Sequence, residues 1–90
     1  MMARTLLKGA EIACPTTTGA ATSFTQATVV RLVNTAAATA IVSLVETQGG
    51  TAIGTMTMLA SSVEFLEKQP TQCVFASAPT VKGAKVGFTG

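Results

Sequence analysis

The sequence predicts an all-β domain, a single small antiparallel β-sandwich of about seven strands (Ig-like or jelly-roll-like) or a small barrel. Thr, Val and Ile supply 28 of the 90 residues, and their branched side chains suit a pleated sheet. Turn residues recur at intervals of about 8–12 residues, as in sandwiches. The 15 Ala favour helix by propensity, but no apolar stripe of helical period develops around them. At this length the chain forms one domain, residues 1–90.

The first 26 residues differ from the rest. Arg4 to Cys14 alternates enough to predict a strand with a kink near Gly9. Pro15 ends it, because proline removes a ladder donor and restricts the residue before it. Residues 16–23 are a Thr/Ala-rich loop with no packing groups before Phe24. We expect residues 1–26 to form an N-terminal strand and loop, an arm that contacts a neighbour.

Residues 27–88 form the regular core of the prediction. Six strands are expected over residues 27–34, 39–47, 51–59, 62–68, 72–78 and 81–88. Gln48-Gly49-Gly50 predicts a hairpin turn, because glycine accepts positive φ without steric cost. In residues 62–68, Val63 and Phe65 share one face of the strand.

Some predicted strands are apolar on both faces. Val29, Arg31 and Val33 lie opposite Val30 and Leu32. A lone sandwich usually exposes a polar face to water, so a second apolar face predicts cover by another protein chain. Met56 and Met58 share a face of residues 51–59 and either line an adaptable contact surface or fill the core. The expected interface residues are Val29, Arg31, Val33, Met56 and Met58.

The composition argues against catalysis. A Ser or Cys nucleophile needs a base, most often His oriented by Asp, and the chain has neither His nor Asp. Glu64 and Glu67 are three residues apart in a strand, so they point to opposite faces. A Ser–Lys pair with Lys82 or Lys85 is formally possible, but solvated surface lysines are the better account. We therefore expect no enzyme, no catalytic residues and no small-molecule substrate.

Metal and cofactor sites are not expected either. The only two cysteines, Cys14 and Cys73, are 59 positions apart, whereas zinc sites group four ligands. Calcium loops need clustered Asp and Asn. Gly49-Gly50 fits a hairpin turn better than a phosphate cradle, which opens a helix. We expect two free, buried thiols in preference to a Cys14–Cys73 disulfide.

Nucleic acid and membrane are poor partners for this composition. The net charge is only +2, and the four aromatic residues are all Phe. Single-strand binding needs aromatic platforms in a basic groove, and duplex binding needs a concentrated basic stripe. No apolar stretch approaches the ~18–20 residues of a membrane span, and no secretory signal is expected.

Residues 28–88 resemble a group of small all-β structural proteins of tailed bacteriophages, especially phages of marine cyanobacteria. The resemblance is carried by residues 29–35, 54–59, 63–71 and 81–86, each a strand with its turn. The chain departs from the pattern at Ala60-Ser61, where such proteins often carry Gly before the next strand.

The resemblance implies a virion component without an active site, assembled in the bacterial host cytoplasm. The leading hypothesis is a capsid decoration or cement protein that clamps neighbouring major capsid subunits, as a homo-oligomer with a trimer favoured. The alternatives are a head–tail connector or tail-associated protein, and a host-glycan-binding module, which the lack of Trp and Tyr disfavours. Independently, a domain this small buries only about two-thirds of its unfolded surface, so assembly would add stability.

Overall fold

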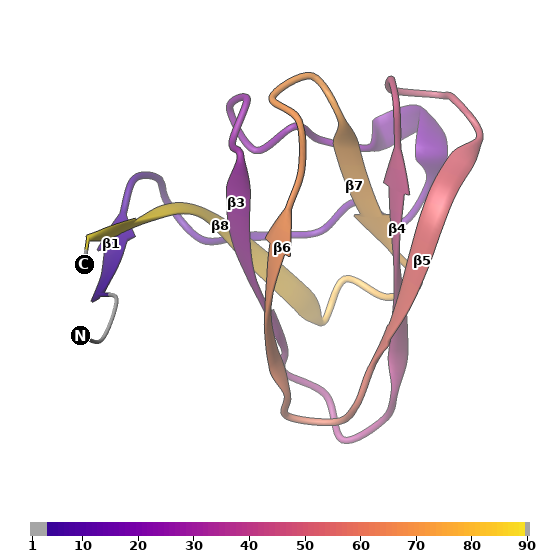
Figure 1. Cartoon of the computed structure of the whole chain (residues 1–90). Helices are drawn as coiled ribbons and strands as arrows, with labels where there is room; N and C mark the ends of the chain where they lie inside the picture. Colours follow the sequence, from indigo (N-terminus) through magenta and orange to yellow (C-terminus); the bar gives the residue numbers. More distant parts are fainter. Residues whose placement is uncertain (1–3, 90) are drawn as a thin grey trace.

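The computed structural model describes residues 4–89 as two antiparallel sheets that face each other (Figure 1). The elements in chain order are β1 (Arg4–Leu7), β2 (Ile12–Ala13), the 3₁₀ turn η1 (Thr18–Ala20), β3 (Val29–Asn34), β4 (Ala40–Val45), β5 (Ala52–Met58), β6 (Val63–Glu67), β7 (Cys73–Ala76) and β8 (Val81–Thr89). The described residues contain no α-helix, and therefore none that could cross a bilayer. The predicted all-β class is confirmed.

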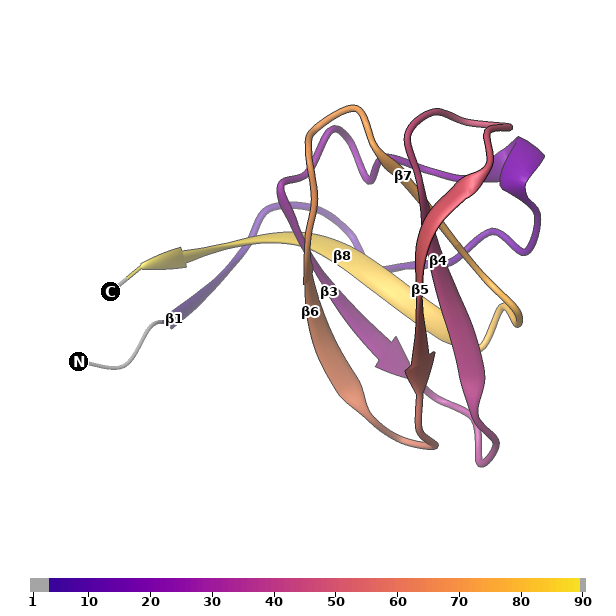
Figure 2. The same cartoon turned by 45° about the vertical axis from the view of Figure 1, so that its right-hand side comes forward.

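Strand order defines the two layers. One sheet has the order β1-β8-β3-β6, with β2 also paired to β8, and the other has the order β5-β4-β7. All pairings are antiparallel. In Figures 1 and 2 the three-stranded sheet lies beside β3, β6 and the first half of β8, which is the arrangement of a sandwich.

Six predicted strands match observed ones to within two residues at each end. The predicted first strand is divided into β1 and β2, which both pair with β8. Leu7 lies opposite Val86 but Ile12 lies opposite Gly83, so two extra residues are accommodated between them. Such an insertion is a bulge that bends the strand, and the predicted kink near Gly9 is confirmed.

The core lies between the sheets and is built from the inner faces of both. Its buried members include Val30, Leu32, Val42, Met58, Val74, Ala76 and Val81, with Cys14 and Phe24 from the N-terminal segment. Burial of these side chains is the main favourable term in folding, at about 25 cal/mol per Å² of apolar area. The alternation predicted for residues 29–33 is confirmed, because Val30 and Leu32 are buried and their neighbours are only half-buried.

One polar side chain organises the end of the core. Asn34 is fully buried, and its Nδ2 donates to the carbonyl oxygens of Ala38 (2.8 Å), Met58 (3.3 Å) and Leu59 (3.3 Å). Its Oδ1 accepts from the N–H of Ala36 at 3.2 Å. The amide therefore links the β3–β4 connection to the end of β5, and these hydrogen bonds offset the cost of its burial.

The loop over residues 16–23 packs against the body, which corrects the expectation that it lacks packing groups. Ala21 is buried against Val45 and Cys73, and Thr22 pairs with Val74 as an isolated bridge. The side chains are small, so the backbone approaches the three-stranded sheet closely. Small size, which in the sequence suggested a loose loop, is what permits this contact.

The expected N-terminal arm is shorter than residues 1–26. Only β1 and its partner segment of β8, Val86–Thr89, extend beyond the sandwich as a two-stranded ribbon (Figure 2). Cys14, Ala21 and Phe24 are each at most 4% exposed, so the later part of this segment belongs to the core. Residues 1–3 lie outside the described part of the chain.

Candidate interaction face

The outer face of the five-stranded sheet, turned away from the core, brings together residues from three strands. In an antiparallel pair, residues opposite each other project to the same side. Val33 lies opposite Val63, and Arg31 lies opposite both Phe65 and Ala84. We call Val29, Arg31, Val33, Val63 and Phe65 the outer face.

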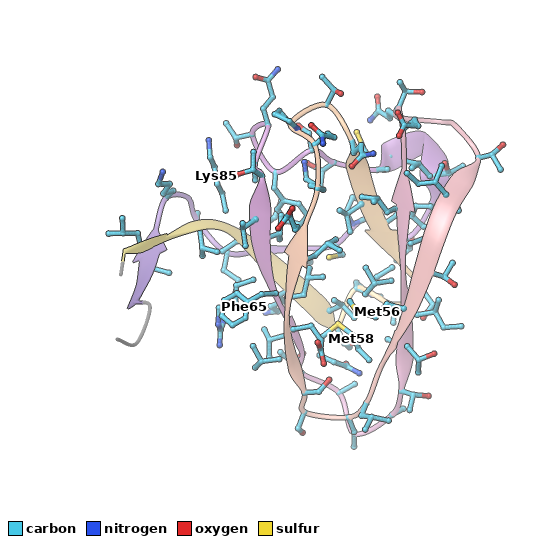
Figure 3. The ribbon with its side chains drawn as sticks, viewed as in Figure 1. Met56, Met58, Phe65 and Lys85 are labelled. Atoms are coloured by element: carbon cyan, nitrogen blue, oxygen red, sulfur yellow. The ribbon has the colours of Figure 1, made fainter. Side chains whose placement is uncertain are left out.

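This face is apolar at its β6 side and exposed to solvent. Val63 is 43% exposed and Phe65 is 47% exposed, while Val29 and Val33 are half-buried. Figure 3 shows Phe65 on the opposite side of its sheet from Met56 and Met58. Val63 and Phe65 therefore place two exposed apolar side chains next to each other on one surface of the sheet.

An ion pair between Arg31 and Glu11 lies on this side of the sheet. The Nη1 of Arg31 lies 3.4 Å from the Oε2 of Glu11, and both side chains are partly exposed. Glu11 belongs to the bulge between β1 and β2, and a hollow of about 530 Å³ lies here, lined by Leu7, Gly9, Glu11, Arg31 and Ala84. An exposed pair of this kind contributes about 0–1 kcal/mol to stability.

The structure separates the five expected interface residues into two groups. Val29, Arg31 and Val33 lie together on the outer face. Met58 is fully buried, so its placement at an interface is corrected: it fills the core. Met56 is partly buried against the same core and lines a cleft of about 170 Å³ between the sheets. Met56 and Met58 occupy alternate positions of β5 and face inward. Ile53, Thr55 and Thr57 occupy the other set of alternate positions and face outward.

Val63 and Phe65 complete the face and were not among the expected interface residues. The sequence placed them on one side of their strand, which the structure confirms. Their position beside β3 depends on strand order, because β6 pairs with β3 although two strands separate them along the chain. The periodicity of a strand carries no information about which neighbour it takes.

The two thiols are buried and free, as expected. Cys14 lies in the main core, and Cys73 lies in the smaller cluster with Ala21 and Val45. Burial raises the pKa of the Cys14 thiol to about 11, because the thiolate loses its hydration. This thiol is therefore a small hydrophobe at neutral pH and a poor nucleophile.

Lys68 is a buried cation without a carboxylate partner among its described contacts. Its side chain is 5% exposed, and its Nζ donates to the carbonyl oxygens of Gln69 (3.2 Å) and Pro70 (3.4 Å). Burial lowers its pKa; the nearby Cys73 acts in the opposite direction, and Lys85 lowers it further. These contacts stabilise the β6–β7 connection, and they direct the ammonium group away from solvent.

Across residues 4–89, no three His, Cys, Asp or Glu side chains are grouped closely enough to hold a metal ion. The outer side of the five-stranded sheet combines the apolar side chains of the outer face with Arg31 and with two further charged residues, Glu67 and Lys82, which lie opposite Val29 and Val33.

No family model matches this chain, and searches of curated proteins and of solved structures likewise find no match.

Proposed function

We propose that this protein is a non-catalytic structural component of a tailed-phage virion, a capsid decoration protein that docks on neighbouring major capsid subunits. The observation that carries this proposal is the outer face, where Val63 and Phe65 expose apolar area beside Val33. The sequence resemblance over residues 28–88 supplies the virion setting. The partner surface would be apolar, with a carboxylate placed to meet Arg31.

The energetics of the outer face favour a role in assembly. Burying one Val or Phe side chain contributes about 1.5–3 kcal/mol, and a protein partner would cover several at once. Tyr, Trp, Phe, Met and Arg are the residue types enriched where proteins meet, and here Phe65 and Arg31 are register partners. Binding through this face involves no bond making or breaking, in keeping with a chain that has no His and no Asp.

A reconstitution experiment tests the proposal. Phage particles that lack this chain are incubated with the purified protein, and the bound copies per major capsid subunit are measured by quantitative mass spectrometry. We expect saturable binding and a higher temperature of particle disruption. Phe65→Ser should weaken binding by about tenfold or more, because truncating an aromatic anchor costs roughly 2 kcal/mol.

A matched control is available on the other sheet. Ile53 is 53% exposed and lies on β5, remote from the outer face, so Ile53→Ser should bind like the unchanged protein. Hundreds of copies per particle would support decoration, whereas about six or twelve would replace it with the head–tail connector hypothesis. Equal binding by the Phe65 and Ile53 variants would remove the outer face from the proposal.

A further inference from the structure

We infer that copies of this chain associate head to tail, with β1 of one copy pairing with β6 of the next. Both strands are ends of the same five-stranded sheet. This association deepens the proposed function, on which it rests, by naming a second copy of the chain as a partner. Strand direction, edge charge and the apolar residues beside each edge all favour it.

Each edge presents backbone groups that can accept another strand. In an antiparallel ladder, alternate residues direct their N–H and C=O groups toward the partner strand, and the residues between direct theirs away. The N–H of Lys8 donates to the carbonyl of Lys85 at 2.9 Å, so Leu7 points its backbone groups away from β8. The N–H of Lys68 donates to the carbonyl oxygen of Thr28 at 2.9 Å, so the backbone N–H and C=O of Glu67 point away from β3.

Strand directions allow the sheet to continue from copy to copy. β1, β8, β3 and β6 are antiparallel in turn, so β1 runs opposite to β6. A second copy placed alongside in the same orientation therefore brings its β1 antiparallel to β6 of the first. The inner and outer sides of the sheet stay on the same sides across the junction.

The charges at the two edges have opposite signs. Arg4 lies in β1 and Lys8 follows it, whereas Glu64 and Glu67 lie in β6 and are exposed. Lys68, next to Glu67, directs its ammonium group to backbone carbonyls and does not offset them at the surface. Pairing β1 with β1 or β6 with β6 would place like charges together, which costs free energy. Only β1 with β6 joins opposite charges.

Apolar residues at the ribbon also find matching positions. Leu7 is 77% exposed and lies on the outer side of the sheet, as Val63 of β6 does. Leu6 is 45% exposed and lies on the inner side, as the partly buried Leu66 does. The ribbon projects from the sandwich (Figure 2), so a neighbouring body can reach β1 along its open edge.

A junction between unlike edges is heterologous, and repeated it closes into a ring or grows into a filament. Each junction involves only one short strand pair, an addition of the kind seen in β-augmentation. A closed ring would be more stable than an open chain of the same subunits, because each subunit is then held at both edges.

The test is a charge exchange followed by sedimentation of the purified full chain over a concentration series. One variant carries Arg4→Glu and Lys8→Glu, and the other carries Glu64→Lys and Glu67→Lys. We expect the unchanged protein to gain mass with concentration, and less so at high salt because screening weakens the attraction. Each variant alone should associate at least about tenfold more weakly.

An equimolar mixture of the two variants should recover the mass of the unchanged protein, because an acidic β1 then meets a basic β6 and the reverse. The controls are Lys82→Glu and Glu46→Lys, which alter charge away from both edges and should associate normally. Monomers of the unchanged protein at every concentration, or a mixture that stays monomeric, would overturn the inference. Monomers that still coat particles would leave the proposed function standing, whereas oligomers that bind no particle would count against that function alone.

Discussion

The ring of Phe24 lies directly over Gly83. A Cβ built on Gly83 would come within 2.7 Å of the Cζ of Phe24, which is closer than any real contact of this kind. Phe24 is 4% exposed and begins a run of three non-glycine residues with positive φ, Phe24 (53°), Thr25 (58°) and Gln26 (58°). The left-handed turn is therefore held by an aromatic side chain that requires a bare backbone on β8.

Gly83→Ala should lower the free energy of unfolding by about 1–3 kcal/mol, because the added methyl group overpacks a buried site. Gly54→Ala is the matched control, since no atom lies within 4 Å of the equivalent position on Gly54, and its effect should stay within about 0.5 kcal/mol. Urea unfolding followed by circular dichroism measures both. Equal stability of the two variants would contradict the packing described for Phe24.

Asn34→Ala should destabilise the fold by about 2–3 kcal/mol, because buried carbonyl groups would lose their donor. Thr35→Ala serves as the control. The hydroxyl of Thr35 donates to the carbonyl of Thr80 at 2.7 Å in an exposed setting, where its loss should cost about 1 kcal/mol or less. Thermal unfolding of the two variants should rank them in this order, and the reverse order would refute the role given to Asn34.

Ser61, in the turn between β5 and β6, has a φ of 58°. Left-handed backbone costs a non-glycine residue about 1–2 kcal/mol, and glycine at this position avoids that cost. Part of the gain is offset, because glycine loses more conformational freedom on folding. Ser61→Gly should therefore stabilise the protein by about 0.5–1 kcal/mol. Chemical denaturation would detect this as a higher midpoint with an unchanged slope, and a lower midpoint would contradict it.

Alkaline pH should destabilise the protein through Cys14. The folded pKa of this thiol is raised from 9.0 to about 11, so the folded state favours the protonated form. The resulting stability is complete below pH 9 and is lost as pH rises from 9 through about 11, by an amount on the order of 2 kcal/mol. Cys14→Ala should flatten this part of the pH–stability curve, and an unchanged slope would assign the loss to other groups.

Local pattern was enough to predict most of the strands. Alternation over Val29 to Val33 placed the buried and outward residues correctly, because a strand has a period of two. The turn predicted at Gly49-Gly50 is present between β4 and β5, but of the two glycines only Gly49 has a positive φ, of 83°, and the connection is longer than a tight hairpin turn. These features depend only on neighbours in the sequence.

Features that depend on distant contacts were missed. The sequence left Met58 open between a contact surface and the core, although it was included among the expected interface residues, and only the position of the second sheet decides that it is covered. Ala21 looked like a loop residue until Val45 and Cys73 were placed next to it. On the outer face, Val63 lies beside Val33 because β6 pairs with β3. The local sequence pattern of either strand does not specify this pairing.

The register of the ribbon also bears on how the chain can be re-engineered. Arg4 and Thr89 are direct partners across β1 and β8, so the two strands can be joined by a short Gly/Ser linker into a hairpin. New ends opened at Gly49-Gly50, in the β4–β5 turn, would give a circular permutant that keeps all the strand pairings. An affinity tag fused to the new ends would extend from the three-stranded sheet. The edge of β1 would then stay unobstructed.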